Sequence, residues 1–96
     1  MSFKAVDIEI GQIIRTLREK KGLTQTDLAI KLGYRTPQFV SLFERGLSKV
    51  PLETLGQLSV ILNFPANRMM DLILRDFEND VAKKIKSGRK RKFKVV

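Results

Sequence analysis

Residues 22–33 read GLTQTDLAIKLG and contain the signals for a short helix that ends in a tight turn. Thr24 followed by Asp27 has the spacing of a capping box, with Asp in place of the usual Glu. The apolar residues of the helix then share one face: Leu28, Ala29 and Leu32. Gly33 follows directly, at a position where a positive φ is expected. The stretch therefore predicts a capped helix that stops at a glycine turn.

A second short helix is predicted after this turn. Thr36 and Pro37 supply an N-cap and a proline at the first helical position, so we expect a helix over residues 37–45. Ala29 is small, as it must be if the second helix crosses closely over the first. Two helices joined in this way form a helix-turn-helix.

The register of the second helix has two solutions. If the helix is aligned from its C-terminal end, Val40 and Phe43 fill the space between the two helices. If it is aligned from Gly33, Phe39 and Leu42 fill that space instead. We prefer the first register because it keeps the cap and the proline at the start of the helix.

Two further helices are predicted on either side of this pair. The first covers about residues 8–21, with Asp7 as a candidate N-cap. Its apolar positions repeat at helical spacing: Ile10, Ile14 and Leu17. The other begins at Pro51 and ends at Asn63. Its apolar residues form one stripe: Leu52, Leu55, Leu58 and Leu62.

A fifth helical pattern begins at Pro65 and repeats an apolar residue at every fourth position. The repeating residues are Met69, Ile73, Phe77 and Val81. The pattern extends to Ile85, and Ser87 and Gly88 are expected to break it. We therefore expect an all-α chain with a long last helix.

The domain organisation follows from the length and from this pattern. A chain of 96 residues has room for one small domain, which we place at residues 8–74. Residues 75–86 extend the last helix beyond it, and residues 87–96 form a basic tail.

The composition excludes several classes of protein. With no Cys and no His, the chain has no disulfide, thiolate nucleophile or ordinary zinc site, and it has no Ser-His-Asp arrangement. Its carboxylates form no catalytic motif, so we expect no enzyme, no cofactor and no metal. No apolar run reaches the length of a membrane span, and the first ten residues lack the basic region of a signal peptide. We expect a cytoplasmic protein.

The net charge of +9 favours a polyanionic partner, but it is unevenly distributed. Residues 15–49 hold eight basic and three acidic side chains, a net +5. Residues 50–82 hold two basic and five acidic side chains, a net −3. Residues 83–96 hold eight basic side chains and no acid, a net +8. The basic charge is thus divided between the helix-turn-helix region and the C-terminal segment.

The chain resembles the phage-repressor/Cro-like (Xre-type) DNA-binding family across roughly residues 10–74. The similarity is carried in order by IIRTLREKKGLTQTDLAIKLG, FVSLFERG and PLETLGQLSVILN. It implies a compact five-helix, repressor-like DNA-binding domain whose third helix enters the DNA major groove. The chain departs from the family by one extra residue in the GYRT segment, between the glycine turn and the ERG triplet.

The resemblance also implies roles for individual residues on DNA. Thr24 caps its helix, and Gln25 reaches a phosphate. Base contacts and their entrance are assigned to Gln38, Phe39, Ser41, Leu42, Arg35 and Thr36, and phosphate contacts to Arg45 and Lys49. Gln38 can pair with adenine through its amide. Phe39 and Leu42 would meet thymine methyl groups, unless they belong to the core or to a protein interface.

Three further assignments concern stability, assembly and the tail. Arg18 and Glu44 match the position of a buried ion pair that contacts no DNA. The apolar stripe beyond the domain predicts a homodimer through Phe77, Val81 and Ile85, unless the helix folds back on its own core. The tail residues expected on phosphates are Arg89, Lys90, Arg91 and Lys92, the alternative being a disordered solubilising tail.

The leading functional hypothesis is a sequence-specific, double-stranded DNA-binding transcriptional regulator, a repressor that binds a palindromic site as a homodimer in the nucleoid. One alternative is a protein-interaction module with a protein partner, such as an antitoxin. The other is a less specific architectural DNA-binding protein that relies on its tail.

Overall fold

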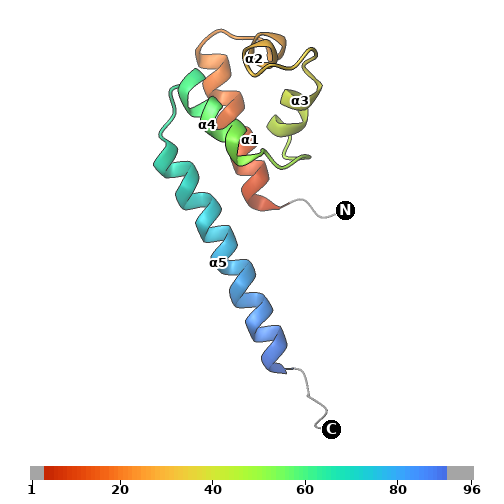
Figure 1. Cartoon of the computed structure of the whole chain (residues 1–96), viewed down its shortest axis with the longest axis vertical. Coiled ribbons are helices and arrows are strands. Elements are labelled where there is room, and N and C mark those ends of the chain that lie inside the picture. The colour runs from red at the N-terminus through yellow and green to blue at the C-terminus, as the bar shows by residue number, and fades with distance from the viewer. Residues whose placement is uncertain (1–3, 91–96) are drawn as a thin grey trace.

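The computed structural model describes residues 4–90, and within that range the chain forms five helices and no strand (Figure 1). The helices are α1 (Ala5–Lys20), α2 (Gln25–Lys31), α3 (Gln38–Glu44), α4 (Leu52–Ile61) and α5 (Ala66–Lys90). Helices α1 to α4 gather into a bundle, whereas α5 leaves the bundle and continues well past it (Figure 1). The predicted all-α fold with an extended last helix is confirmed.

Two predicted helix starts are wrong in detail. Helix α1 begins at Ala5 with Lys4 in the N-cap position, so Asp7 lies in the first turn. A carboxylate there still interacts favourably with the positive end of the helix dipole. Helix α3 has Pro37 in the N-cap position and no side-chain cap, so Thr36 does not cap it. The predicted range of 37–45 is nonetheless correct to within one residue at each end.

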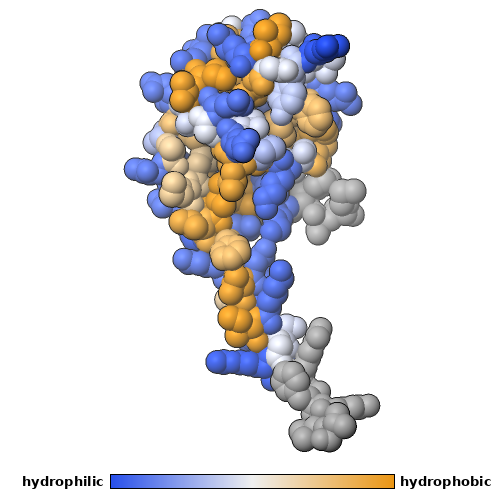
Figure 2. Space-filling model, viewed as in Figure 1, coloured by the Kyte–Doolittle hydropathy of each residue, from blue (hydrophilic) through white to orange (hydrophobic). Residues whose placement is uncertain are grey.

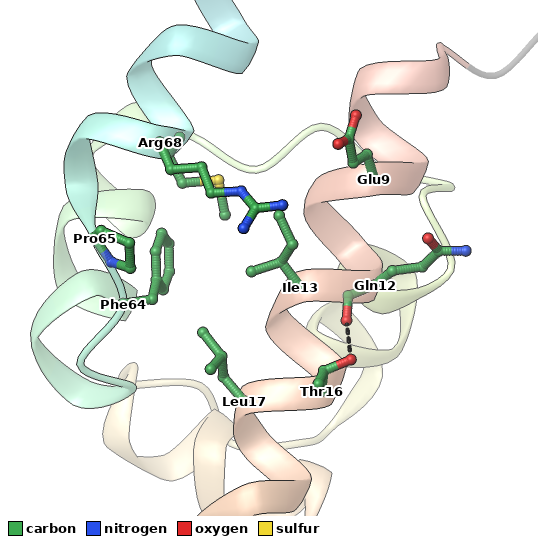
Figure 3. A pocket seen from close by; sticks show the side chains of 9 residues that line it. Glu9, Gln12, Ile13, Thr16, Leu17, Phe64, Pro65 and Arg68 are labelled. Carbon is green, nitrogen blue, oxygen red and sulfur yellow. Dashed lines mark hydrogen bonds between the residues drawn. The ribbon is translucent and has the colours of Figure 1, made fainter.

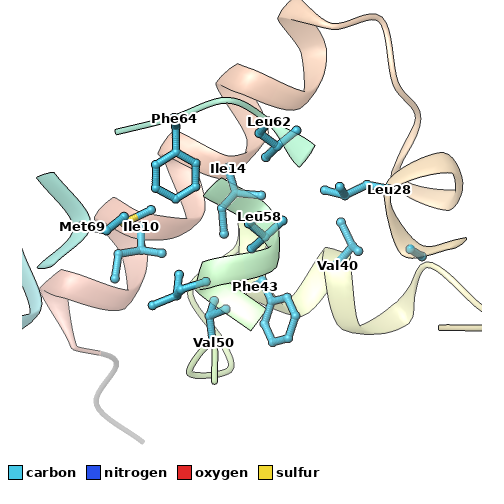
Figure 4. Close-up of a cluster of buried hydrophobic side chains, with 12 residues drawn as sticks. Ile10, Ile14, Leu28, Val40, Phe43, Val50, Leu58, Leu62, Phe64 and Met69 are labelled. Atoms are coloured by element: carbon cyan, nitrogen blue, oxygen red, sulfur yellow. The ribbon is translucent and has the colours of Figure 1, made fainter. Parts of the chain in front are cut away.

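The core lies where the first four helices meet the start of α5 (Figure 4). Its buried apolar residues are Ile10, Ile14, Leu28, Ala29, Val40, Phe43, Val50, Leu55, Leu58, Leu62, Phe64 and Met69. Val40 and Phe43 are 1% and 2% exposed, whereas Phe39 is 49% exposed. The preferred register of α3 is therefore confirmed. Leu52 departs from its predicted stripe, since it is 71% exposed at the start of α4.

The sequence predicted that the last helix would break at Ser87 and Gly88. Instead, α5 continues through both residues to Lys90. A glycine in a helix interior is unfavourable by about 1 kcal/mol. The basic side chains of the last turns oppose this cost, because positive charge is favourable at the C-terminal end of a helix dipole. Phe77 is 63% exposed, and Val81 and Ile85 are exposed as well, so the apolar stripe on the distal half of α5 does not fold back on the core. Within residues 4–90, no helix is both long enough and apolar enough to cross a membrane.

Candidate nucleic-acid interface

The start of α2 carries the predicted capping box. The backbone N–H of Asp27 donates to Thr24 Oγ1 at 3.0 Å, and the backbone N–H of Thr24 donates to Asp27 Oδ2 at 2.9 Å. The bond from the Thr24 backbone lowers the pKa of Asp27 below its usual value. The other N–H groups of the first turn remain directed outward along the helix axis, where they suit an anion such as a phosphate.

The turn between α2 and α3 has the predicted glycine geometry. Gly33 has a φ of +89°, and its N–H donates to the Ile30 carbonyl at 3.0 Å. The Tyr34 N–H donates to the Ala29 carbonyl at 2.9 Å, which completes a Schellman-type helix end. Ala29 is fully buried, as a close helix crossing requires. The chain therefore leaves α2 in a defined direction and positions α3 across it.

The ion pair expected between Arg18 and Glu44 is present and links α1 to α3. Arg18 Nε donates to Glu44 Oε2 at 2.6 Å, and Arg18 Nη2 donates to Glu44 Oε1 at 3.0 Å. Arg18 Nη1 also donates to the Leu23 carbonyl, at 2.7 Å. The Glu44 side chain is only 2% exposed. Hydrogen bonding to Glu44 raises the pKa of Arg18 above its usual value, so the guanidinium stays charged.

Gln25 joins the same network, which the sequence did not predict. Its Nε2 donates to Glu44 Oε1 at 3.0 Å, from the first turn of α2 to the last turn of α3. One of its two amide N–H groups is thus used within the protein, and the phosphate contact that the family resemblance implied would need the other. The carboxylate of Glu44 therefore connects three helices at one point.

Gly11 sets the distance between α1 and α3, and sequence analysis assigned it no role. A methyl group built at Gly11 would lie 2.7 Å from the carbonyl oxygen of Glu44 and closer still to that of Phe43. Only a residue without Cβ allows the backbone of α3 to approach α1 this closely. The sequence signal that could have revealed this close approach is a glycine in the middle of a predicted helix, one turn before a core residue.

The outward face of α3 contains the residues assigned to base contacts. Gln38 and Phe39 are exposed at its N-terminal end, and Ser41 and Leu42 are half-buried. Arg35 and Thr36 are exposed in the preceding loop. Four of the six predicted side chains therefore lie on α3 with part of their surface exposed, and the other two lie in the loop that leads into it.

The ring of Phe39 stacks on Tyr34, a residue that sequence analysis did not single out. The ring centroids are 5.0 Å apart, and the planes meet at 25°. Phe43 lies beneath both rings at 6.3–6.4 Å, which connects the exposed aromatic surface to the core. Tyr34 belongs to the GYRT segment that departs from the family, and its ring holds Phe39 in place on the outer face of α3.

Basic side chains border this face. Arg35 precedes α3, whereas Arg45 and Lys49 follow it, and all three are exposed. Arg45 Nε donates to the Ser41 carbonyl at 3.4 Å, which keeps part of its guanidinium close to α3. The cationic groups at the border of this surface suit anionic groups such as phosphates. The polar and aromatic side chains between them suit flat polar groups such as the edges of bases.

The predicted tail contacts lie far from this surface or outside the described residues. Arg89 and Lys90 are exposed in the last turn of α5, at the end remote from the bundle (Figure 1). Arg91 and Lys92 lie outside residues 4–90. The structure therefore does not bring the basic end of α5 to α3 within one chain.

A separate pocket of about 380 Å³ opens between α1 and the start of α5 (Figure 3). Its apolar wall contains Ile13, Leu17 and Phe64, and Glu9 and Arg68 lie at its rim on opposite sides. It contains none of the residues assigned to DNA and is not part of the candidate interface.

Comparisons with known proteins agree with this geometry. A family model described as a helix-turn-helix domain matches residues 9–72. Endothelial differentiation-related factor 1 of Rattus norvegicus is 34% identical over 87 residues, which cover 91% of this chain and 51% of that protein. The chain therefore spans about half the length of the curated relatives it matches.

Solved structures share the fold. The restriction-modification controller protein C.AhdI from Aeromonas hydrophila superposes with a TM-score of 0.61 at 32% identity, covering 69% of this chain and 98% of that one. SinR, a master regulator for biofilm formation solved in complex with DNA, superposes with a TM-score of 0.55 at 31% identity, covering 64% of this chain and 97% of that one. With its capped α2, glycine turn and buried ion pair, the chain belongs to the helix-turn-helix domain family, in the Cro-like (Xre-type) group predicted from its motifs.

Proposed function

We propose that the chain is a sequence-specific, double-stranded DNA-binding transcriptional regulator that inserts α3 into the major groove. The observation that carries this proposal is the outward face of α3, which is held rigidly and bordered by cations. Glu44 fixes the far end of the helix through Arg18 and Gln25, so Gln38 is presented on a support that spans three helices. The DNA complex of SinR, which is 31% identical to this chain, supports the same ligand class.

The proposed phosphate contacts lie around this face. Arg35, Arg45 and Lys49 provide the cations, and the first turn of α2 provides outward N–H groups beside Gln25. Phosphate contacts place a protein on the duplex, whereas base-edge contacts select the sequence. On this basis Gln38 selects a base, while the basic residues contribute equally on every sequence.

We further propose that the chain acts as a homodimer on a palindromic site and represses transcription. The exposed residues Phe77, Val81 and Ile85 supply an apolar surface for the second copy. In this proposal the repressor acts by binding DNA and needs no catalytic site. It works in the compartment that holds the chromosome. Of the four basic tail residues, Lys90, Arg91 and Lys92 are proposed to add sequence-independent attraction to phosphate.

The test is selection from random duplex DNA followed by binding measurements with Gln38→Ala. A specific regulator should prefer its selected site over random DNA by about 10³-fold or more. Gln38→Ala should remove the preference at one base step, a loss of about 1–3 kcal/mol for that step. Gln57→Ala, at an exposed position of α4, is the matched control and should leave the preference intact. Equal affinity for all duplexes would instead indicate an architectural DNA-binding protein.

The exposed ring of Phe39 favours a second candidate function, the docking of a protein on α3. Phe39→Ala distinguishes the two. If Phe39 meets a thymine methyl group, the substitution changes the selected DNA sequence. If α3 serves a protein partner, DNA affinity and preference stay as they were and the chain loses that partner instead.

A further inference from the structure

Helix α4 and the first turns of α5 enclose an apolar groove of about 400 Å³. Leu52, Leu55, Phe64, Met69, Met70 and Leu74 contribute to its lining. Leu52 and Met70 are more than half exposed, so the groove presents apolar surface to solvent. An open apolar surface of this kind marks a site for another macromolecule.

The groove continues into an apolar stripe along the distal half of α5. Figure 2 shows this stripe as a band that descends from the bundle toward the far end of the helix. Its exposed members are Met70, Leu74, Phe77, Val81 and Ile85. The first four are spaced by four, three and four residues, which is the spacing of a seam between two paired helices. Groove and stripe therefore form one continuous surface that a second helix can cover.

The charges on α5 are divided between its two halves. Residues 71–80 hold four acidic side chains and one basic one, and Asp76 and Asp80 among them are paired with Lys4, whereas residues 83–90 hold five basic side chains and no acid. In a parallel pair, acidic half would lie beside acidic half and basic half beside basic half. In an antiparallel pair, each acidic half lies beside a basic half. The charge pattern therefore selects the antiparallel orientation.

Asp71 and Arg89 define the register of such a pair. They are 18 residues apart, which is five turns at 3.6 residues per turn, so they lie on the same flank of the stripe. A two-fold axis near residue 80 brings the same flanks of two antiparallel helices together. The same axis places Leu74 within one residue of Ile85 across the apolar seam, so the charge pattern and the apolar pattern agree on nearly the same register.

We propose that two copies of this chain pair through α5 in antiparallel orientation, each distal half lying toward the α4–α5 groove of the other copy, with Asp71 opposite the partner's Arg89. The inference rests on the homodimer of the proposed function and defines its interface. It assigns Arg89 to the dimer rather than to DNA phosphate. The overlap of the two helices places the two bundles at opposite ends of the pair and so sets the spacing of the two α3 helices.

Disulfide crosslinking tests the orientation, because the chain contains no native cysteine. Leu74→Cys and Ile85→Cys are prepared separately, checked for folding by circular dichroism, and oxidised alone and mixed. The antiparallel pair predicts a disulfide between the two different variants in the mixture and little crosslinking in either variant alone. Crosslinks between identical variants would indicate a parallel pair and overturn the proposal. A dimer that forms no crosslink at all would overturn it too, since the interface would then lie elsewhere.

Charge reversal tests the register in the absence of DNA. Asp71→Arg should weaken dimerisation about tenfold, because it replaces an attraction by a repulsion at both symmetric contacts. Arg89→Asp in the same chain should restore the dimer. Lys83→Glu, on the side of α5 opposite the stripe, is the charge-reversal control and should change the dissociation constant little. Failure of the double variant to recover would refute the register.

Sedimentation of the unsubstituted chain separates this inference from the proposed function. A monomer at every concentration tested would refute the homodimer itself and the inference with it. A dimer with the wrong crosslinks would refute only the antiparallel arrangement. DNA selection, which does not depend on either result, would still test the role of α3.

Discussion

Removing Arg18 should destabilise the protein more than any exposed substitution does. Arg18→Met keeps much of the side chain's length but removes three hydrogen bonds, two to Glu44 and one to the Leu23 carbonyl. The Glu44 carboxylate, 98% of whose side-chain surface is inaccessible, then keeps only the bond from Gln25. A buried charge with so few partners makes the folded state unfavourable.

The magnitude follows from that burial. Breaking a buried ion pair by removing one partner costs about 3–5 kcal/mol. Small domains are stable by about 5–15 kcal/mol, so the loss is a large share of the total. With a urea dependence of about 1–3 kcal/mol per molar, the unfolding midpoint should fall by about 2 M.

A double-mutant cycle isolates the pair. Arg18→Met combined with Glu44→Leu removes both charges and leaves apolar groups of similar size, an exchange that is often close to neutral. The double variant should therefore be more stable than the sum of the two single effects predicts, by about 2 kcal/mol. Urea unfolding followed by circular dichroism measures all four proteins. A single-variant loss below about 1 kcal/mol, or additive losses, would refute a buried and coupled ion pair.

Three further predictions concern the glycines and the contact between Lys4 and α5. Gly11→Ala should lower both the stability of the fold and its affinity for DNA, because a methyl group there meets the backbone of α3. Gly56→Ala, in an open helical position of α4, is the control and should not destabilise the protein. Equal effects of the two substitutions would contradict the close approach at Gly11. Gly88→Ala should raise the helix content of α5 and add about 0.5–1 kcal/mol to helix stability, and an unchanged circular dichroism spectrum would argue against a helix through this residue. The hydrogen bond from Lys4 to Asp80, 2.7 Å long, lowers the pKa of Asp80, so its contribution to stability is present above the ordinary aspartate pKa and is lost as the pH falls through the lowered value. NMR titration of Lys4→Met should show the pKa of Asp80 rising toward its usual value, and no change would rule out the contact.

Much of the α2–α3 region was predictable because its signals are local. The capping box of Thr24 and Asp27, the turn at Gly33, and the burial of Val40 and Phe43 each depend on residues a few positions apart. Backbone geometry and helical periodicity act over that range, so spacing alone identifies them. The order of five helices follows from the same signals.

The errors arose where competing local signals had to be weighed. Asp7 and Thr36 are good capping residues, but α1 starts earlier and α3 starts later than they suggest. Gly88 is a poor helix residue, yet the basic last turns allow α5 to pass through it. In each case the deciding energy difference is about 1 kcal/mol, which is smaller than the sum of the neighbouring effects.

The sequence by itself determined the helices, the turn and the identity of the helix that carries the candidate interface. Only the tertiary structure decided what holds that helix in place: the close approach at Gly11, the bond from Gln25 to Glu44, and the stacking of Phe39 on Tyr34. It also showed that the stripe beyond Met70 is left uncovered by the described part of the chain. Local patterns act along one helix, whereas these contacts depend on the distance and angle between helices, which are set by the packing of the whole core.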